Sequence, residues 1–265
     1  GSPYGSRYLE DLQSAFHRLG PDGFEWFIGN EQKRQFEAIR DRLLDHVADL
    51  RAREGHWMEP SILGRMVRAG DLDETSLGHL IYMVEMGRFD LASLFRWITK
   101  YVAEDRSLQE RLHAGGGTQL GSRQSLPQAV VQETLRMDQI ERLMRVVDRD
   151  LIFDGYLLPR FSTVRLCLWE SHKSPGTFAD PFRFNPDRFL ERTYGNDDFA
   201  PFGLLHHRCP FGGLVLHLGA LFLHRLAADY TLAPVQDGPP VRARYHWQPA
   251  PDFTVQLRPR TAPLH

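Results

Sequence analysis

The stretch FAPFGLLHHRCPFGG, residues 199–213, presents a single cysteine, Cys209, just ahead of an apolar segment. A thiolate is costly to bury unless a metal ion or positive groups stabilise its charge. The stretch also supplies three positive or hydrogen-bonding side chains: His206, His207 and Arg208. Residues 212–226 are expected to form a helix, whose N-terminal amides favour an anionic sulfur. A cysteine in this setting suits an iron-bound thiolate.

This stretch resembles the cysteine-ligand signature of the cytochrome P450 family, Phe-Gly-x-Gly-x-His-x-Cys-x-Gly. Four residues match it: Phe202, Gly203, His207 and Cys209. Leu205 replaces the second glycine, and the last glycine is replaced by Phe211 or displaced by one position to Gly212. The resemblance implies that Cys209 binds haem iron. It also implies that three neighbours contact the cofactor: Phe202, His207, as the histidine that binds a propionate, and Arg208.

Composition narrows the function classes. The 265 residues can form one large domain. With 32 Lys+Arg against 34 Asp+Glu, the net charge of −2 gives no electrostatic reason to bind nucleic acid or an anionic membrane. No apolar run is long enough to cross a membrane. Two cysteines are too few for a disulfide framework, which favours the cytoplasm. Cys167 is expected to be a small buried residue in a strand.

The first two-thirds of the chain is expected to be mainly helical. Apolar spacing predicts helices at 31–53, 61–69, 75–104, 105–113, 126–138 and 212–226. Strands are expected at 143–147, 151–157, 163–168, 230–233 and 253–257, with a hairpin turn at Asp154–Gly155. The glycine-rich stretch 114–125 lacks the Gly-Lys-Ser/Thr ending of a phosphate loop and is expected to be a linker. Four aromatic residues are expected to pack in the core: Phe178, Phe182, Phe184 and Phe189.

A second motif is Glu133-Thr-Leu-Arg136, which puts a carboxylate and a guanidinium on one face of a helix. Residues 180–189, DPFRFNPDRF, resemble the family segment Pro-x-x-Phe-x-Pro-x-Arg-Phe. In the family, the arginine of that segment joins the Glu-x-x-Arg pair in a buried triad. The resemblance therefore implies that Glu133, Arg136 and Arg188 hold the cysteine loop against the core.

Two further segments follow in the family's order. Arg145 resembles the strand arginine that binds a haem propionate, and residues 172–175 resemble a His-Arg-Asp-Pro corner. The implied fold is mainly α with small β-sheets, a truncated cytochrome P450-like fold. It keeps the C-terminal half: the long central helix, the Glu-x-x-Arg helix, the cysteine-ligand loop and the following helix. Residues 1–70 are expected to be N-terminal helices left from the substrate roof, and 71–265 the haem-binding core.

The chain departs from the family in its length. Family members carry an N-terminal Trp-x-x-x-Arg helix that binds a propionate. Three tryptophans are candidates for this motif, but each lacks an arginine four residues on: Trp26, Trp57 and Trp97. Either the protein is shortened, or another chain or copy completes the pocket, so a dimer or a partner chain is expected.

The long helix also departs from the family. The family places Gly-x-Asp/Glu-Thr above the haem, where the acid and the threonine deliver protons to dioxygen. Residues 86–91 align with it and keep Gly87, which leaves room for a distal ligand. The acid position becomes Phe89 and the threonine position Asp90, or Asp90 and Leu91 after a shift of one residue. Since neither register has the threonine, ordinary dioxygen activation is not expected.

Two charged residues of this segment each have two interpretations. Arg88 either holds a substrate carboxylate or phosphate over the haem, or pairs with Glu85 away from it. Asp90 either acts as an acid–base group in a closed pocket, where its pKa would rise, or lies on an exposed stripe. The candidate catalytic residues are Gly87, Arg88 and Asp90.

The leading functional expectation is an oxidoreductase that binds haem b through Cys209. Its chemistry would be peroxide-dependent oxidation, or haem-assisted rearrangement, dehydration or bond formation, on a small apolar metabolite of secondary metabolism. A redox partner or peroxide would be needed. The alternative is a haem-free relative that serves as a binding partner or performs acid–base chemistry. A zinc site at His206, His207 and Cys209 is disfavoured because a fourth ligand at useful spacing is lacking.

Overall fold

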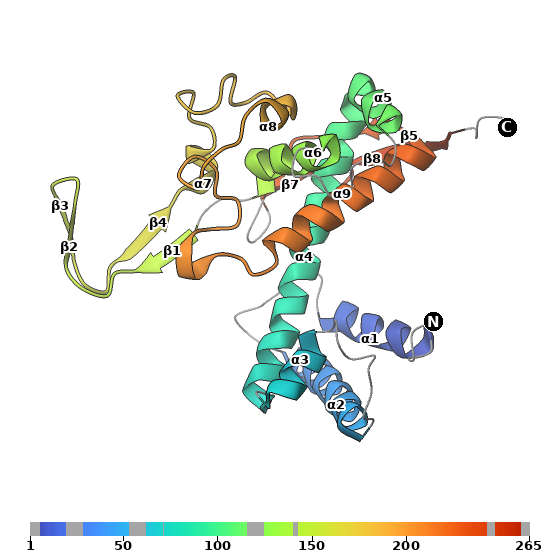
Figure 1. Cartoon of the computed structure of the whole chain (residues 1–265), viewed down its shortest axis with the longest axis vertical. Helices are drawn as coiled ribbons and strands as arrows, with labels where there is room; N and C mark the ends of the chain where they lie inside the picture. The colour runs from blue at the N-terminus through green and yellow to red at the C-terminus, as the bar shows by residue number, and fades with distance from the viewer. Residues whose placement is uncertain are drawn as a thin grey trace. The chain divides into compact units, whose positions relative to one another are not determined.

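The structure, a computed structural model, describes residues 6–19, 29–52, 62–70, 72–115, 125–139, 143–242 and 247–260. Most of the linker expected at 114–125 lies outside the described residues. The chain forms two compact units, Gly1–Asp90 and Leu91–His265, whose elements are drawn in Figure 1. The long helix α4, Glu74–Glu104, contributes residues to both units.

The first unit is helical. It contains α1 (Ser6–Leu19), α2 (Asn30–Ala52), α3 (Ile62–Ala69) and the start of α4. Its core joins residues from α1, α2 and α4: Ala15, Phe16, Ile39 and Ile81. Apolar residues three or four positions apart on α2 face this core, as the spacing predicted. Helix α1 was not expected from the sequence.

The second unit contains the rest of α4 and several shorter helices. They are α5 (Arg106–Ala114), α6 (Leu126–Thr134), α7 (Leu168–Ser171), α8 (Asp187–Glu191) and α9 (Gly212–Asp229). The N-cap side chains Asp105 and Ser125 accept hydrogen bonds from the first turns of α5 and α6. The helix expected over 126–138 does not stay regular, because α6 passes into a π-helix, η2 (Leu135–Gln139).

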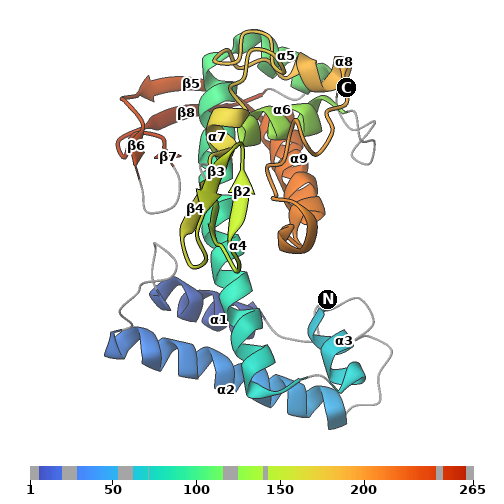
Figure 2. The ribbon, with the colours of Figure 1, turned by 90° about the vertical axis from the view of Figure 1, so that its left-hand side faces the viewer.

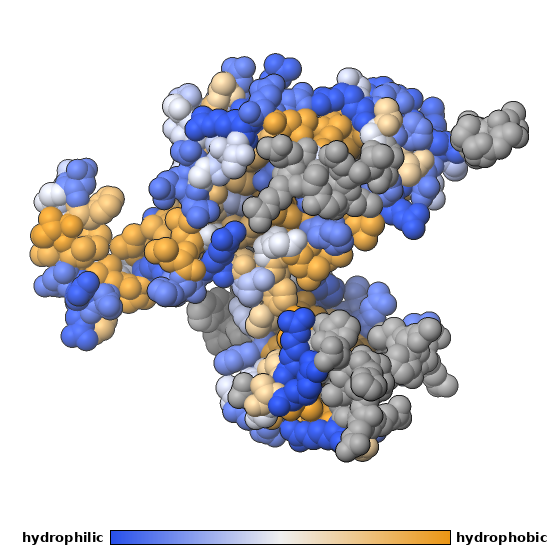
Figure 3. Space-filling view, viewed as in Figure 1, coloured by the Kyte–Doolittle hydropathy of each residue, from blue (hydrophilic) through white to orange (hydrophobic). Residues whose placement is uncertain are grey.

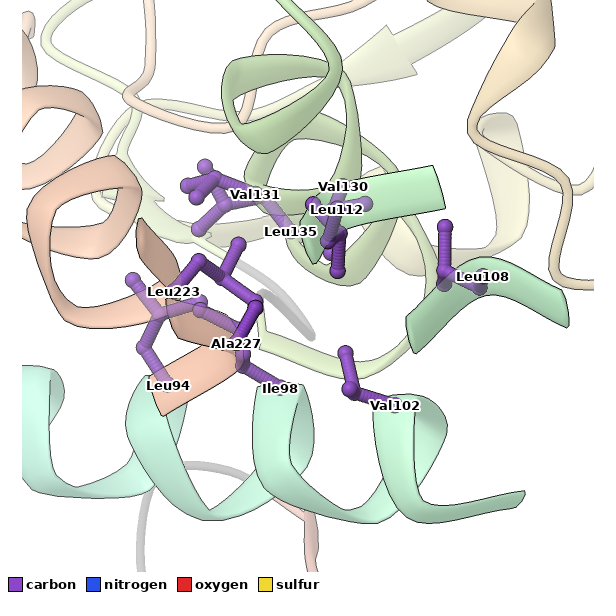
Figure 4. Close-up of a cluster of buried hydrophobic side chains, with 10 residues drawn as sticks. All are labelled: Leu94, Ile98, Val102, Leu108, Leu112, Val130, Val131, Leu135, Leu223 and Ala227. Atoms are coloured by element: carbon purple, nitrogen blue, oxygen red, sulfur yellow. The ribbon is translucent and has the colours of Figure 1, made fainter. Parts of the chain in front are cut away.

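The main core of the second unit lies between α4, α5, α6 and α9 (Figure 4). Its buried members are Leu94, Ile98, Val102, Leu108, Leu112, Val130, Val131, Leu135, Leu223 and Ala227. Helices α6 and α9 approach closely at Gly219, where a Cβ atom would lie 2.8 Å from Cγ2 of Val131. Helix α6, which carries the start of the Glu-x-x-Arg motif, thus packs directly against α9, which follows Cys209.

The strands form four two-stranded antiparallel sheets among the described residues. The pairs are β1 (Leu143–Val146) with β4 (Thr163–Leu166), β2 (Leu151–Phe153) with β3 (Tyr156–Leu158), β5 (Tyr230–Gln236) with β8 (Thr254–Pro259), and β6 (Val241–Arg242) with β7 (Trp247–Gln248). Figure 2 shows the last two sheets together. Asp154 and Gly155 both have positive φ, as expected of a tight hairpin turn. The mainly helical fold with small sheets confirms the expected class.

Two details of the sequence interpretation are wrong. Cys167 is exposed, because β4 ends at Leu166 and the chain turns into α7 there. Phe182 is also exposed, whereas Phe178 and Phe189 are buried and Phe184 stacks on Tyr101 with ring centroids 4.1 Å apart. Of the described helices, none combines the length and apolar character that a membrane span requires.

Candidate functional site

The loop before α9 holds Cys209 in a closed turn. The cysteine is a half-buried free thiol, and its backbone N–H donates to the Phe202 carbonyl at 2.7 Å. Gly203 has φ +70°, and a Cβ atom there would lie 3.1 Å from the His207 carbonyl oxygen. The turn therefore requires glycine at position 203. Helix α9 begins three residues after the thiol, and its N-cap, Phe211, makes no side-chain capping bond.

The Phe202 ring packs against the first residue of α9. A Cβ atom on Gly212 would lie 3.0 Å from two carbons of that ring. Of the two positions considered for the last glycine of the signature, 211 and 212, it is Gly212 that makes a close contact requiring glycine. The contact fixes the aromatic side of the loop to α9.

Leu205 occupies the place of the second signature glycine in a conformation that suits glycine. Its φ is +52°, and its side chain is 89% exposed. A left-handed conformation costs a residue with a side chain roughly 1–2 kcal/mol. Because the side chain extends into solvent, it does not fill the loop.

Replacing Leu205 by glycine is expected to raise the free energy of unfolding by about 0.5–1 kcal/mol. Relief of the left-handed strain exceeds the added chain entropy of glycine, which costs about 0.5–1 kcal/mol. Leu204 is the matched control, because its φ of −130° is extended backbone. Leu204→Gly should destabilise the protein in the same urea titration. Equal destabilisation by both changes would contradict the strain at position 205.

Three candidate cofactor-binding side chains lie in this loop or on strand β1. His207 and Arg208 are exposed, and Arg145 is half-buried and donates to the Met144 carbonyl at 2.7 Å. In the described part of the chain, none of the three has a carboxylate partner. Their N–H donors are therefore available to an anionic group.

Glu133 lies between Arg136 and Arg188. Arg136 Nε and Nη2 donate to its two carboxylate oxygens at 2.7 and 2.8 Å, and Arg188 Nε donates at 3.2 Å. The Asn185 N–H adds a fourth bond to the carboxylate, at 2.8 Å. All three charged side chains are buried. Buried charges are tolerated when each of them has a direct partner, as these three do.

The remaining donors of the two arginines bind backbone carbonyls. Arg136 Nη1 donates to His172 O at 2.8 Å and to Pro181 O at 2.7 Å, and Arg188 Nη1 donates to Ala179 O at 2.9 Å. The segment between α7 and α8 is irregular, so these bonds replace those that a helix or sheet would provide. The cluster thereby holds the chain that leads to the cysteine loop.

His172 connects this segment to the start of the loop. Its ring is buried between Phe178 and Phe199, and Nε2 accepts from the Ala200 N–H at 3.1 Å. Burial lowers the pKa of His172 to about 4, and the nearby charges of Lys173 and Arg136 add to this. A protonated ring could no longer accept from Ala200, so the structure requires the neutral form.

Acidification from pH 6.5 to 4 is expected to weaken the protein through His172. The folded pKa of about 4 lies below the ordinary 6.5, so the unfolded chain binds the extra proton in this window. Above pH 6.5 the neutral His172 costs the folded protein nothing. Between pH 6.5 and 4 the free energy of unfolding is expected to fall by roughly 3 kcal/mol. Urea unfolding at several pH values measures it, and His172→Gln should flatten the profile. Burial raises the pKa of Asp138, which acts in the opposite direction in both proteins. Parallel profiles would contradict the assignment.

A half-buried hydrogen bond joins α4 to the π-helix. The Tyr101 hydroxyl donates to the Asp138 carboxylate, and burial raises the pKa of both groups. Lys173 donates to the Arg136 and Met137 carbonyls at 2.9 and 2.7 Å, and burial lowers its pKa to about 7. Sequence reasoning missed the Tyr101–Asp138 pair because no local pattern joins residues 37 positions apart.

The three candidate catalytic residues of the long helix belong to the first unit. A Cβ atom on Gly87 would meet no atom within 4 Å. Arg88 pairs with the buried Glu85 at 2.8 Å and donates to the Phe16 carbonyl at 3.4 Å. Of its two interpretations, the pairing with Glu85 is therefore the one that the structure contains. Asp90 is half-buried rather than fully exposed.

Comparison with known proteins identifies the family. Residues 92–244 match the model of the family described as Cytochrome P450. The chain is 25% identical to cytochrome P450 88A1 of Zea mays over 86% of its own length and 48% of that protein. It is 25% identical to ent-kaurenoic acid oxidase 2 of Arabidopsis thaliana over 88% and 48%, and 29% identical to abscisic acid 8'-hydroxylase 1 of the same plant over 60% and 37%.

Solved structures show the same fold. A crystal structure of a cytochrome P450 (CYP102L1) matches 94% of this chain and 65% of its own, with a TM-score of 0.76 at 18% identity. The haem domain of cytochrome P450DA matches 96% and 61%, with a TM-score of 0.77 at 16% identity. The chain thus spans about half the length, or less, of the plant relatives named above. The matched model, the relatives and the fold agree: the chain belongs to the cytochrome P450 family.

Proposed function

We propose that this chain provides the thiolate side of a haem-thiolate oxidoreductase, with Cys209 as the ligand of the iron of haem b. The observation that carries the proposal is the loop itself. It holds one half-buried thiol through the bond from Cys209 N–H to Phe202 O, directly before the uncapped start of α9. A single soft sulfur ligand with positive surroundings fits a thiolate-bound iron.

The other donors also fit a haem. Its propionates are carboxylates, and Arg145, His207 and Arg208 have no carboxylate partner in the described part of the chain. Phe202 would flank the cofactor, and Glu133, Arg136 and Arg188 would keep the loop in place. When bound, such a haem supplies oxidation or rearrangement chemistry at an iron made electron-rich by the thiolate. Residues 71–265 as a haem-binding core, beside N-terminal helices at 1–70, remain a prediction.

The proposed substrate is a small apolar metabolite. The names of two relatives, abscisic acid 8'-hydroxylase and ent-kaurenoic acid oxidase, support a small organic molecule as the substrate. Because neither register of residues 86–91 places a threonine where the family has one, peroxide or a haem-assisted rearrangement is proposed in place of ordinary dioxygen activation. Gly87, in the same segment, leaves space beside its Cα.

The proposed setting and partners follow from the same observations. The low cysteine count supports a reducing compartment such as the cytoplasm. A redox partner or peroxide would supply the oxidising equivalents, and a second copy or a partner chain is the proposed protein partner. The alternative is a haem-free relative, which the leucine in place of the signature glycine, Leu205, would favour.

The deciding experiment is the absorption spectrum of the purified protein, reconstituted with haem and reduced, with and without carbon monoxide. A thiolate-bound carbonyl complex has a Soret band that is shifted strongly to longer wavelength, and that band is expected. Turnover of apolar substrates with peroxide would then test the oxidation chemistry. A protein that takes up no haem on reconstitution would overturn the proposal in favour of the haem-free alternative.

A further inference from the structure

A pocket of about 780 Å³ lies in the second unit, between α6, the segment after α8 and the start of α9. Figures 1 and 2 both show α6 between α8 and α9. The volume is typical of small-molecule sites, which span about 300–1,000 Å³. Among the described residues, neither Cys209 nor any part of α4 lines the pocket, so this is not the space in which the thiol would meet an iron. The pocket is therefore a second candidate binding site.

One side of the pocket carries polar side chains without protein partners. Gln128 and Gln132 are four positions apart and so lie on one face of α6, and Arg208 comes from the cysteine loop. Within the described ranges, these three side chains make no hydrogen bond or ion pair. Arg192 also lines the pocket, but it already pairs with Asp198 at 3.4 Å. Two amides and one guanidinium thus remain for a ligand.

The first turn of α9 brings backbone N–H groups to the same pocket. Gly212 and Gly213 line it without side chains, and the N-cap of the helix, Phe211, makes no side-chain capping bond. The first N–H groups of a helix have no acceptor within it. A Cβ atom on Gly213 would meet nothing within 4 Å, so the space beside this residue is open. Together with a free guanidinium, such N–H groups suit a phosphate.

Aromatic rings form the other side of the pocket. Phe189 packs on Tyr194 and Phe199, with ring centroids 5.2 and 4.9 Å apart. The Phe202 ring has no ring partner in the part of the chain that the structure describes. A planar group can therefore pack against it. Figure 3 shows hydrophilic and hydrophobic residues mixed over the part of the second unit that contains α6, α8 and the start of α9.

We propose that this pocket binds an aromatic phosphate of nucleotide size. The phosphate lies at Arg208 and the start of α9, and the aromatic ring lies against Phe202. A phosphate has three acceptor oxygens for these donors, one more than a carboxylate offers. Gln128 and Gln132 each present an NH₂ donor and a carbonyl acceptor to the polar groups of the ligand.

The proposal stands apart from the haem assignment. Of the three side chains considered for the propionates, Arg208 is the one that lines this pocket. Assigning Arg208 to the phosphate leaves Arg145 and His207, one for each propionate. Phosphate-ligand binding can be absent while the Soret band of the carbonyl complex appears, and the reverse, so the two assignments fail separately.

Calorimetric titration of the whole chain with three related compounds tests the ligand class. AMP should bind at least tenfold more tightly than adenosine, which lacks the phosphate, and than inorganic phosphate, which lacks the ring. Equal affinity for AMP and adenosine would overturn the phosphate assignment, and equal affinity for AMP and phosphate would overturn the aromatic one. If neither AMP nor 1-naphthyl phosphate bound at millimolar concentration, the pocket would not be an aromatic phosphate site.

A charge variant tests the place of the phosphate. Arg208→Gln should weaken AMP binding about tenfold or more, because a hydrogen bond between charged groups is lost, and should change adenosine binding little. Arg149→Gln is the matched control, because Arg149 is exposed, has no carboxylate partner among the described residues and does not line the pocket. Equal losses in both variants would show a general attraction to positive charge and overturn the site.

A filled pocket tests the location without removing a charge. Gly213→Leu should weaken AMP binding at least tenfold, because the added side chain enters the open space beside position 213. Its urea midpoint should not fall, since leucine has the higher helix propensity and meets no atom at its Cβ. Circular dichroism confirms folding of each variant. A folded Gly213→Leu protein that binds AMP as the unaltered chain does would place the ligand elsewhere.

Discussion

Replacing Glu133 by glutamine is expected to lower the free energy of unfolding by about 3–5 kcal/mol. The carboxylate is the charged partner of both Arg136 and Arg188, and all three side chains are buried. A glutamine keeps the shape but leaves two buried guanidinium groups without a counter-charge. Urea unfolding followed by circular dichroism measures the change.

An exposed pair with the same spacing provides the control. Glu31 pairs with Arg34 at 2.6 Å, also three residues apart on a helix, but both side chains are more than half exposed. Glu31→Gln should therefore leave the unfolding transition almost unchanged. If the two glutamine variants had similar stabilities, the buried cluster would not hold the segment before the cysteine loop as described.

Replacing Cys209 by serine is expected to remove the thiolate spectrum and lower haem affinity at least 100-fold. Changes to residues that merely support a metal ligand already cost about 10–100-fold, and this change removes the ligand itself. The serine is close in size, and the backbone bond to Phe202 O does not involve the side chain. The fold should therefore persist. Haem titration and the carbon monoxide difference spectrum give the two measurements.

The second cysteine supplies the matched control. Cys167 is exposed at the start of α7, and its Sγ is 4.0 Å from the Arg165 carbonyl. Cys167→Ser should bind haem as the unaltered protein does. A thiolate spectrum that survives in Cys209→Ser and disappears in Cys167→Ser would reverse the ligand assignment, and loss in both variants would point to damage to the fold.

Much of the helical framework could be predicted, because each helix buries one apolar face. The spacing of Phe36, Ile39 and Leu43 placed α2 within a residue at each end. The turn residues Asp154 and Gly155 likewise located the β2–β3 hairpin, since their type suits positive φ. Local rules of this kind need no knowledge of distant partners.

Features that depend on distant contacts could not be predicted. The sequence of the π-helix η2 continues a regular helical pattern. Two of its residues, however, bond to residues far along the chain: Arg136 to Pro181 and Asp138 to Tyr101. Only the family resemblance brought Arg188 beside Glu133, because spacing alone says nothing about residues 55 positions apart.

The site itself shows the same division. Cys209 and the cations beside it stand out in the sequence, whereas the left-handed conformation of Leu205 does not, because propensity disfavours it. The acceptor role of His172 could not be predicted either. The tautomer of a buried imidazole is set by its hydrogen-bond partner, here the Ala200 N–H.

The contact between α6 and α9 limits how this sequence can drift over evolutionary time. Any side chain at Gly219 would meet Val131 at 2.8 Å, so a larger residue has to push the two helices apart. A Cβ atom at Gly213, in the first turn of the same helix, meets nothing within 4 Å. Cys209 precedes α9 by only three residues, so a substitution at 219 that moves α9 also displaces the thiol. A substitution at 213 requires no such movement. Neighbouring lineages should therefore vary freely at 213 and keep glycine at 219.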